Sequence, residues 1–182
     1  MASMDPQGFK DIPENRIAEA LFEDAEYFLK AARYYERKNQ KRARTYVRAS
    51  VITAFAALES LVNFYCFWIA EHGDVEPHEE AFLREKRFEL AKEGYFEMRT
   101  SRFSSLEQKV RFLHWWSKNI PIPKRSAAWS AFIEATKLRN SLVHPRPGHI
   151  SYSGQTVTAA KSCLIAVFKV AQMFGWPAQE IH

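Results

Sequence analysis

The residues best suited to chemistry lie in the C-terminal half of the chain, where residues 137–145 read KLRNSLVHP. Arg139, Asn140 and His144 bring strongly polar groups to the end of a stretch that otherwise forms core. Imidazole exchanges protons near neutral pH, and a guanidinium suits the charge of a phosphate. This set predicts acid–base chemistry at a phosphate group. The structural alternative is that Arg139 pairs with an acid such as Glu59 and that His144 only caps a helix.

The stretch RNSLVHP resembles the R-N-x-x-x-H-P signature of the HEPN superfamily (higher eukaryotes and prokaryotes nucleotide-binding domains). The order of the expected helices and the stretch AFAALESLVN, which places Glu59 on an early core helix, are also similar to that family. The likeness extends over about residues 14–175, but only the short motif is specific. It implies an all-α bundle, commonly a homodimer and in many members a metal-independent endoribonuclease. It implies the fold more strongly than catalysis, because some members have lost nuclease activity.

The spacing within the motif limits how its side chains can meet. Asn140 and His144 are four residues apart and share one face of a helix, whereas Arg139 lies about 140° around a straight helix from His144. A bent last turn, the reach of Arg139 or a second copy of the helix could bring the two together. The last option gives a composite site across a two-fold homodimer, in which each residue is present twice, and it is also what the resemblance implies.

The resemblance implies cleavage of RNA without a metal or cofactor, and the residue types of the motif suit that chemistry. The 2′-hydroxyl of RNA supplies the nucleophile, so the protein has to move protons and stabilise charge. His144 is the expected general acid or base, Arg139 stabilises the phosphorane oxygens, and Asn140 orients His144 or the phosphate. The expected products are a 2′,3′-cyclic phosphate and a 5′-hydroxyl.

The sequence leaves open two further questions, the biological role and whether the chain is an enzyme at all. Family analogy alone adds a role as a toxin or defence component, with a cognate antitoxin protein as a partner. The rival to the enzyme is a noncatalytic HEPN-like helical module that binds RNA, a nucleotide or a partner protein.

Glu59 lies in the middle of the most apolar stretch of the sequence, residues 49–70. An unpaired buried carboxylate is costly, so Glu59 needs a partner, and Arg139 is the natural candidate. We expect Glu59 to hold Arg139 in place without contacting the substrate itself. The alternative is that Glu59 lies on an exposed strip of its helix.

Basic residues gather in two places that fit contacts with RNA phosphates. The start of the second expected helix has no acid to balance its cations, although the helix dipole disfavours cations there. The candidates at that helix are Lys41, Arg42, Arg44 and Arg48, and the candidates around the motif are Lys137, Arg146 and His149. The alternative for both sets is a solvated charged face.

The composition indicates a globular chain, with 182 residues of which 47% are hydrophobic and 26% are charged. We expect one domain over residues 1–182, with residues 1–13 as a flexible N-terminal segment. The net charge of +5 is compatible with a polyanionic partner such as RNA.

Two cysteines, Cys66 and Cys163, are too few for a disulfide framework or a four-cysteine zinc site. They indicate reduced core residues in a cytoplasmic protein, and the N-terminal sequence has no apolar stretch typical of a signal peptide. Residues 49–70 are long enough to span a membrane. The carboxylate of Glu59 in their middle favours a buried bundle helix, so no membrane contact is expected.

Apolar spacing predicts helices nearly throughout the chain. The first helix has one apolar face formed by Ile17, Leu21, Ala25, Phe28, Ala32 and Tyr35. The second covers about residues 41–72 and ends before Gly73, with an apolar stripe of Val47, Val51, Ala54, Leu58, Leu61, Tyr65 and Ile69. Residues 79–100 are charged and loosely periodic, which favours a helix with an irregular tail.

The rest of the chain also reads as helix. A capping box from Ser104 to Glu107 predicts a short helix that reaches about residue 118, and the next helix covers about residues 126–144. The last helix is expected from Val157, Ala160, Leu164, Val167, Ala171 and Phe174, with Gly175 closing it. No strand pattern is convincing. The predicted fold is an all-α, up-and-down, HEPN-like bundle of four long helices plus a short extra helix.

Overall fold

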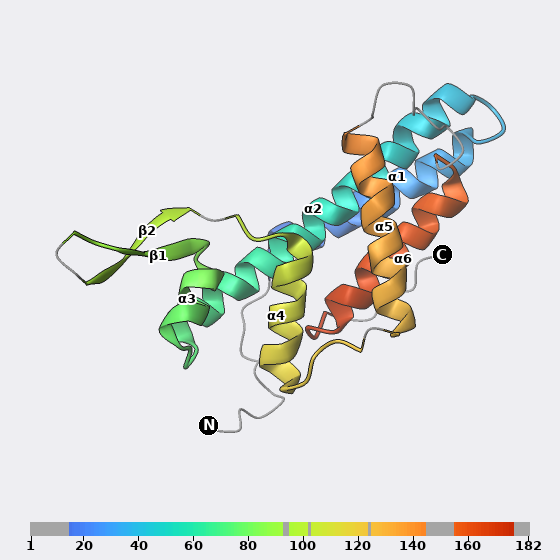
Figure 1. Ribbon diagram of the computed structural model, residues 1–182. Helices are drawn as coiled ribbons and strands as arrows, with labels where there is room; N and C mark the ends of the chain where they lie inside the picture. The colour runs from blue at the N-terminus through green and yellow to red at the C-terminus, as the bar shows by residue number, and fades with distance from the viewer. Residues whose placement is uncertain (1–14, 93–94, 102, 124, 145–154, 177–182) are drawn as a thin grey trace. The chain divides into compact units, whose positions relative to one another are not determined.

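The computed structural model describes residues 15–92, 95–101, 103–123, 125–144 and 155–176, and these ranges are mainly helical (Figure 1). Their elements are α1 (Arg16–Tyr35), α2 (Gln40–His72), α3 (Pro77–Leu83), β1 (Lys86–Leu90), β2 (Phe96–Ser101), α4 (Leu106–Lys118), α5 (Ala127–Val143) and α6 (Val157–Gln172). The expected all-α bundle class is confirmed, with α1, α2, α5 and α6 as its longer helices. The N-terminal segment expected to be flexible lies outside the described residues.

The chain packs as two compact units, and α2 contributes to both. The first unit holds α1, α2 as far as Ser60, α5 and α6, and it contains the candidate site. The second unit comprises Leu61–Pro121, with the rest of α2, α3, the two strands and α4. Because the division falls inside a helix and not in a linker, the single domain expected from the chain length stays a prediction.

The buried face of α1 is formed by small residues at seven-residue spacing with larger ones between them. Its fully or nearly fully buried members are Ala18, Phe22, Ala25, Leu29 and Ala32. The face expected from the sequence is confirmed at Ala25 and Ala32, but it is wrong at Ile17, which is largely exposed, and Leu21, Phe28 and Tyr35 are only partly covered. Alanine at the contact positions leaves room for a neighbouring helix to approach closely.

Polar groups fix α1 against α2 at two levels. Asn15 caps α1 by accepting the N–H of Ala18 at 3.1 Å, and its Nδ2 donates to the carbonyl oxygen of Ser60 at 3.1 Å. Ser50 is fully buried and donates its hydroxyl to the carbonyl oxygen of Ala25 at 2.8 Å. The buried hydroxyl of Ser50 thus has an acceptor, which avoids a penalty of about 1–3 kcal/mol for an unmade hydrogen bond.

The seven-residue apolar stripe expected on α2 is confirmed in full, because every member is buried. The helix ends as expected before Gly73, whose N–H donates to the carbonyl oxygen of Ile69 at 2.8 Å. A Cβ at residue 73 would lie 2.6 Å from that same oxygen, which explains the glycine. Of the described helices, α2 alone is long and apolar enough to cross a membrane, and half of its most apolar window is buried inside the protein.

α5 and α6 complete the first unit and pack on each other. Phe132 of α5 is fully buried with its ring 6.1 Å from that of Phe55 on α2. Phe168 of α6 stacks on Phe22 of α1 at 4.5 Å. The apolar stripe expected on α6 is buried throughout, and Gly175, with φ of 85°, follows the helix as expected.

The second unit holds the main departure from the expected fold. Residues 79–100 do not form a helix with an irregular tail: the short α3 ends at Leu83, and β1 and β2 then pair as an antiparallel hairpin. The register sets Phe88 opposite Met98 and Leu90 opposite Phe96. Apolar residue types thus alternate in both strands, a period-two signal that the surrounding charges obscured.

A buried lysine links the hairpin region to α2 and α4 of the same unit. Lys109 of α4 is 8% exposed at its side chain, and its Nζ lies 2.9 Å from Glu85 Oε1 and 2.7 Å from Asn63 Oδ1. The capping box at the start of α4 is present, but it is formed by Ser105 and Gln108, one residue later than expected.

Candidate functional site

Arg139 lies on the last two turns of α5, and its guanidinium is held on two sides. Its Nη2 lies 3.3 Å from Oε1 of Glu59 on α2, and its Nη1 donates to Oδ1 of the adjacent Asn140 at 3.1 Å. Its Nε–H has no acceptor among the described residues, although the atom is buried. A buried donor without an acceptor costs about 1–3 kcal/mol, so the two bonds of the Nη atoms are formed at the expense of an unsatisfied Nε–H.

The expected contact between Glu59 and Arg139 is therefore present. The environment of Glu59 differs from the buried one considered above, because its side chain is 42% exposed while that of Arg139 is 29% exposed. Water still reaches the carboxylate, so the ion pair stabilises the fold only modestly. Together with the bond to Asn140, the ion pair restricts the positions that the guanidinium can take. The supporting role of Glu59 stays a prediction.

His144 terminates α5 and is not on a continuing helix. The last helical residue is Val143, and His144 has φ of −123° and ψ of 68°, while its N–H still donates to the carbonyl oxygen of Asn140 at 2.9 Å. The helix thus ends at the position expected from the following proline. The imidazole is exposed, and among the described residues no hydrogen bond joins it to Arg139 or Asn140.

The structure thus brings together three of the four residues expected at the site. Glu59, Arg139 and Asn140 form one group connected by side-chain hydrogen bonds, and within the described residues no hydrogen bond joins the exposed ring of His144 to this group. Because His144 has left the helical geometry, the angle of about 140° calculated for a straight helix does not fix the direction of its ring. The expected meeting of Arg139 and His144 across a homodimer stays a prediction.

The basic candidates on α2 lie at its first turns, as expected. Lys41 and Arg42 are exposed there, and this first turn contains no acid. Arg48 is engaged within the protein, donating from Nη1 to Gln155 Oε1 at 3.1 Å and from Nη2 to Thr45 Oγ1 at 3.4 Å. Arg44 lines a pocket of about 180 Å³ together with Gln40, Ala43, Val47, Glu36 and residues 155–157.

Of the candidates around the motif, only Lys137 lies in the described residues. Its Nζ forms an exposed ion pair with Glu134 Oε1 at 2.7 Å on the surface of α5. Arg146 and His149 lie outside the described residues. Because both side chains are largely exposed, this ion pair is weak and the contact of Lys137 with RNA stays a prediction.

Both cysteines are buried and unpaired, as expected for reduced core residues. Burial raises the pKa of the Cys66 thiol to about 12, and burial likewise raises the pKa of the Cys163 thiol to about 12. Neither sulfur is therefore a nucleophile near neutral pH, because the thiolate is the reactive form.

Two exposed tyrosines beside the basic turn were missed from the sequence. Tyr27 and Tyr34 lie on α1 with side chains 64% and 60% exposed. Lys38 places its Nζ 3.7 Å from the centre of the Tyr34 ring, and Arg42 places its guanidinium 5.5 Å from the centre of the Tyr35 ring. A tyrosine recurring after seven residues, with a lysine between, is the signal that could have identified this face.

No protein-family model matches the chain, and no curated protein or solved structure is significantly similar to it.

Proposed function

We propose that the chain is a HEPN-like, metal-independent endoribonuclease that acts as a homodimer. One observation carries the proposal: Glu59 and Asn140 hold the Arg139 guanidinium near the end of α5, and His144, whose ring is exposed, directly follows the last residue of the same helix. The oriented cation can bind a phosphate, and the exposed imidazole can exchange protons with a bound substrate.

The mechanism follows from the roles of these groups. The 2′-hydroxyl of RNA attacks the adjacent phosphorus, and neutral His144 takes its proton. The imidazolium so formed then donates a proton to the leaving 5′-oxygen. Arg139 stabilises the negative charge that develops on the phosphorane oxygens. Asn140 keeps the guanidinium in position through its side-chain oxygen, and Glu59 supports it from α2. The leaving group departs as a 5′-hydroxyl, and the other fragment retains a 2′,3′-cyclic phosphate.

The test is an RNA cleavage assay in EDTA with the wild type, Arg139→Ala and His144→Ala. We expect cleavage by the wild type, loss of activity by at least about a hundredfold in both variants, and no cleavage of a fully 2′-deoxy substrate. Arg125→Ala and His78→Ala remove exposed residues of the same types and should retain full activity. Equal activity in all variants would identify a contaminating nuclease and reject the proposal.

The dimer is tested by mixing the two inactive variants after partial unfolding and exchange. If the site combines residues of both copies, mixed dimers regain activity, up to about a quarter of the wild-type rate, because about half of the dimers are mixed and each mixed dimer has one intact site of two. If Arg139 and His144 act within one copy, the mixture stays inactive. Light scattering on the wild type gives the oligomeric state independently, and a monomer would exclude the composite site.

The second candidate function is a noncatalytic helical module that binds RNA, a nucleotide or a partner protein. The observation that favours it is the separation of His144 from Arg139, because no hydrogen bond joins the two side chains within the described residues. Binding of RNA without cleavage, unchanged in His144→Ala, would support this candidate. The role as a toxin or defence component with an antitoxin partner rests on the resemblance alone, and the cytoplasmic location rests on the two cysteines and the N-terminal sequence.

A further inference from the structure

The positive charge of the protein is concentrated in one segment around the turn between α1 and α2. Residues 33–48 contain seven basic residues and one acid, Glu36, which gives a net charge of +6. The whole chain carries +5, so all remaining residues together carry −1. Like charges crowded in one segment repel one another and do not help the fold, so this distribution points to a polyanionic partner.

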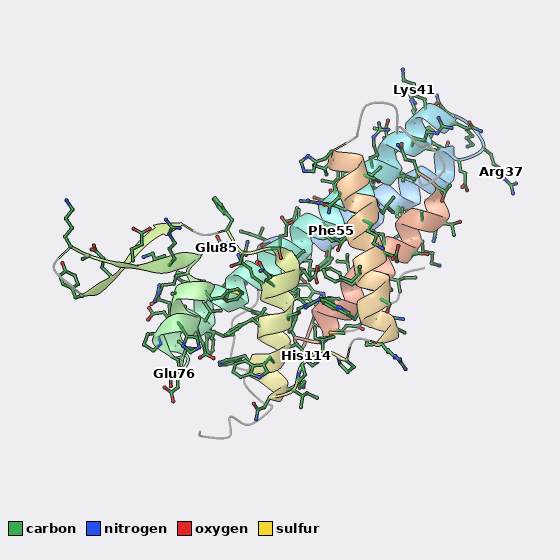
Figure 2. All side chains as sticks on the ribbon, viewed as in Figure 1. Arg37, Lys41, Phe55, Glu76, Glu85 and His114 are labelled. Carbon is green, nitrogen blue, oxygen red and sulfur yellow. The ribbon has the colours of Figure 1, made fainter. Side chains whose placement is uncertain are left out.

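The cations of this turn are placed for an external ligand. Arg37, Lys38, Lys41 and Arg42 form no ion pair with a described carboxylate. Figure 2 shows Arg37 and Lys41 extending outward from the turn, and both are exposed. Lys38 and Arg42 lie over tyrosine rings, where a cation stays available to a phosphate because no fixed anion neutralises it.

Exposed aromatic rings continue this charged turn along α1. Tyr27 and Tyr34 are seven residues apart, so they lie on one face of the helix about 10 Å apart along its axis. Lys30 lies between them on that face and is largely exposed, with its Nζ 4.0 Å from Glu26 Oε2. This face ends on its N-terminal side at two exposed acids, Glu23 and Asp24, which lie about one helical turn before Tyr27. Tyrosine and lysine thus alternate along the exposed side of α1.

We propose that this tyrosine–basic surface, formed by Tyr27, Lys30, Tyr34, Arg37, Lys38, Lys41 and Arg42, binds single-stranded nucleic acid. Bases stack on Tyr27 and Tyr34, and the phosphates between them pair with the cations of α1 and of the turn. The separation of about 10 Å equals about three nucleotide rises of 3.4 Å, so one strand can reach both rings. Stacking accepts any base, so the surface binds with little sequence preference.

Two other polyanions fit the surface less well. An anionic membrane also attracts clustered cations, but exposed Leu, Phe or Trp would strengthen such binding by insertion, and the aliphatic residues of this segment, Ala43 and Val47, are buried. Duplex nucleic acid presents phosphates but no unstacked bases, and it would leave the exposed tyrosines without a role. A single strand uses both kinds of side chain.

The surface is separate from the proposed cleavage site. Lys41 and Glu59 are eighteen residues apart on α2, a distance of about 27 Å along the helix axis. Arg139, Asn140 and His144 are not part of the surface. Binding there goes beyond the proposed function and does not depend on it, since a strand that cannot be cleaved should bind equally well.

The test is fluorescence anisotropy with a labelled deoxythymidine dodecamer, which lacks the 2′-hydroxyl and so reports binding alone. We expect Tyr27→Leu and Tyr34→Leu each to weaken binding about tenfold, because each removes one base-stacking ring. Tyr95→Leu removes an exposed tyrosine elsewhere and should have no effect. Helicity by circular dichroism confirms that each variant is folded.

The phosphate contacts are tested by the salt dependence of the same binding. Lys38→Gln combined with Lys41→Gln should reduce the slope of log K against log salt concentration by about 1.4, since two single-strand phosphate contacts are lost. Lys161→Gln combined with Lys169→Gln removes the same charge from α6 and should leave the slope unchanged. Equal effects of the two lysine pairs would overturn the site and leave only attraction by net charge.

Two further probes decide between the possible partners. A duplex of the same length should bind more weakly and should not respond to the tyrosine substitutions. Vesicles of phosphatidylcholine and phosphatidylglycerol should not bind the protein in sedimentation. Binding to vesicles but not to the dodecamer, or loss of affinity in none of the tyrosine variants, would overturn the proposal.

Discussion

The ion pair between Glu59 and Arg139 gives the sharpest test of how the candidate site is held. At 3.3 Å, two unit charges attract by about 1 kcal/mol in water and by about 5 kcal/mol at an effective dielectric constant of 20. Both side chains are partly exposed, and holding them together costs conformational entropy. We therefore expect a coupling energy of about 1 kcal/mol in a cycle of Glu59→Gln, Arg139→Gln and the double variant.

The measurement is urea unfolding followed by circular dichroism for all four proteins. Glu134 and Lys137 supply a matched control on the same helix, because their charges lie 2.7 Å apart and both side chains are about 70% exposed. Their coupling should be about 0.3 kcal/mol. A Glu59–Arg139 coupling no larger than this control would refute the reasoning, since it would mean that partial burial adds nothing. At about 1 M salt the larger coupling should fall, because the screening length shortens to about 3 Å.

The same substitution separates a positioning role for Glu59 from a purely structural one. If Glu59 holds Arg139 against developing charge, Glu59→Gln lowers kcat by about tenfold, leaves KM nearly unchanged and does not move the pH profile set by His144. Glu134→Gln, its counterpart in the exposed pair, should leave kcat unchanged. A parallel loss of kcat and stability in both variants would indicate damage to the fold and not to the site.

Three further predictions concern stability, each measured by urea unfolding. Glu85→Gln leaves the buried Lys109 cation without its carboxylate and should lower the free energy of unfolding by about 2 kcal/mol. Lys109→Met removes the cation itself and should lower it less. The reverse order would contradict this account. Phe132→Ala should cost about 3–4 kcal/mol through a cavity at a fully buried ring, and a loss below about 1 kcal/mol would show that the site collapses. Because the pKa values of Cys66 and Cys163 are raised to about 12 by burial, the unfolded state loses their protons first, and stability should fall as pH rises from about 9 toward 12. This fall should be smaller in the double alanine variant, and an equal fall would assign it to other groups.

Long helices with a continuous apolar stripe could be predicted well from the sequence. Each stripe residue expected on α2 and α6 is buried, because these helices are covered along most of their length. On α1 the prediction found Ala25 and Ala32 but missed Ala18, Phe22 and Leu29, because it also followed bulky residues such as Ile17 and Phe28. The core there is built on Ala18, Ala25 and Ala32, which carry little hydrophobic weight in a sequence but allow close helix contact.

The hairpin was missed for a different physical reason. Its strands are five and six residues long, and like charges face each other in the register, with Arg87 opposite Arg99 and Glu89 opposite Glu97. Such pairs weaken a sheet, so local preference alone argued against strands. An ion pair within one strand, between Arg87 and Glu89 at 2.6 Å, offsets part of that repulsion.

At the candidate site, the contact between Glu59 and Arg139 could be predicted from the sequence, but the solvent exposure of the two side chains could not. A carboxylate in the middle of an apolar helix predicts a partner, and that partner is present. Its exposure could not be predicted, because it depends on how α5 crosses α2. The direction of the His144 ring could not be predicted either, since the residue lies just beyond the last helical turn.

The boundary inside α2 has a practical consequence for anyone who wishes to divide this protein. A cut between Ser60 and Leu61 would sever one continuous helix and uncover side chains that are buried on both sides of the break, among them Leu58 and Val62. Each fragment would then expose apolar side chains that are buried in the intact protein, and both fragments should aggregate when expressed alone. Shortening from the chain ends, which leaves α2 whole, is the safer route to a smaller soluble fragment.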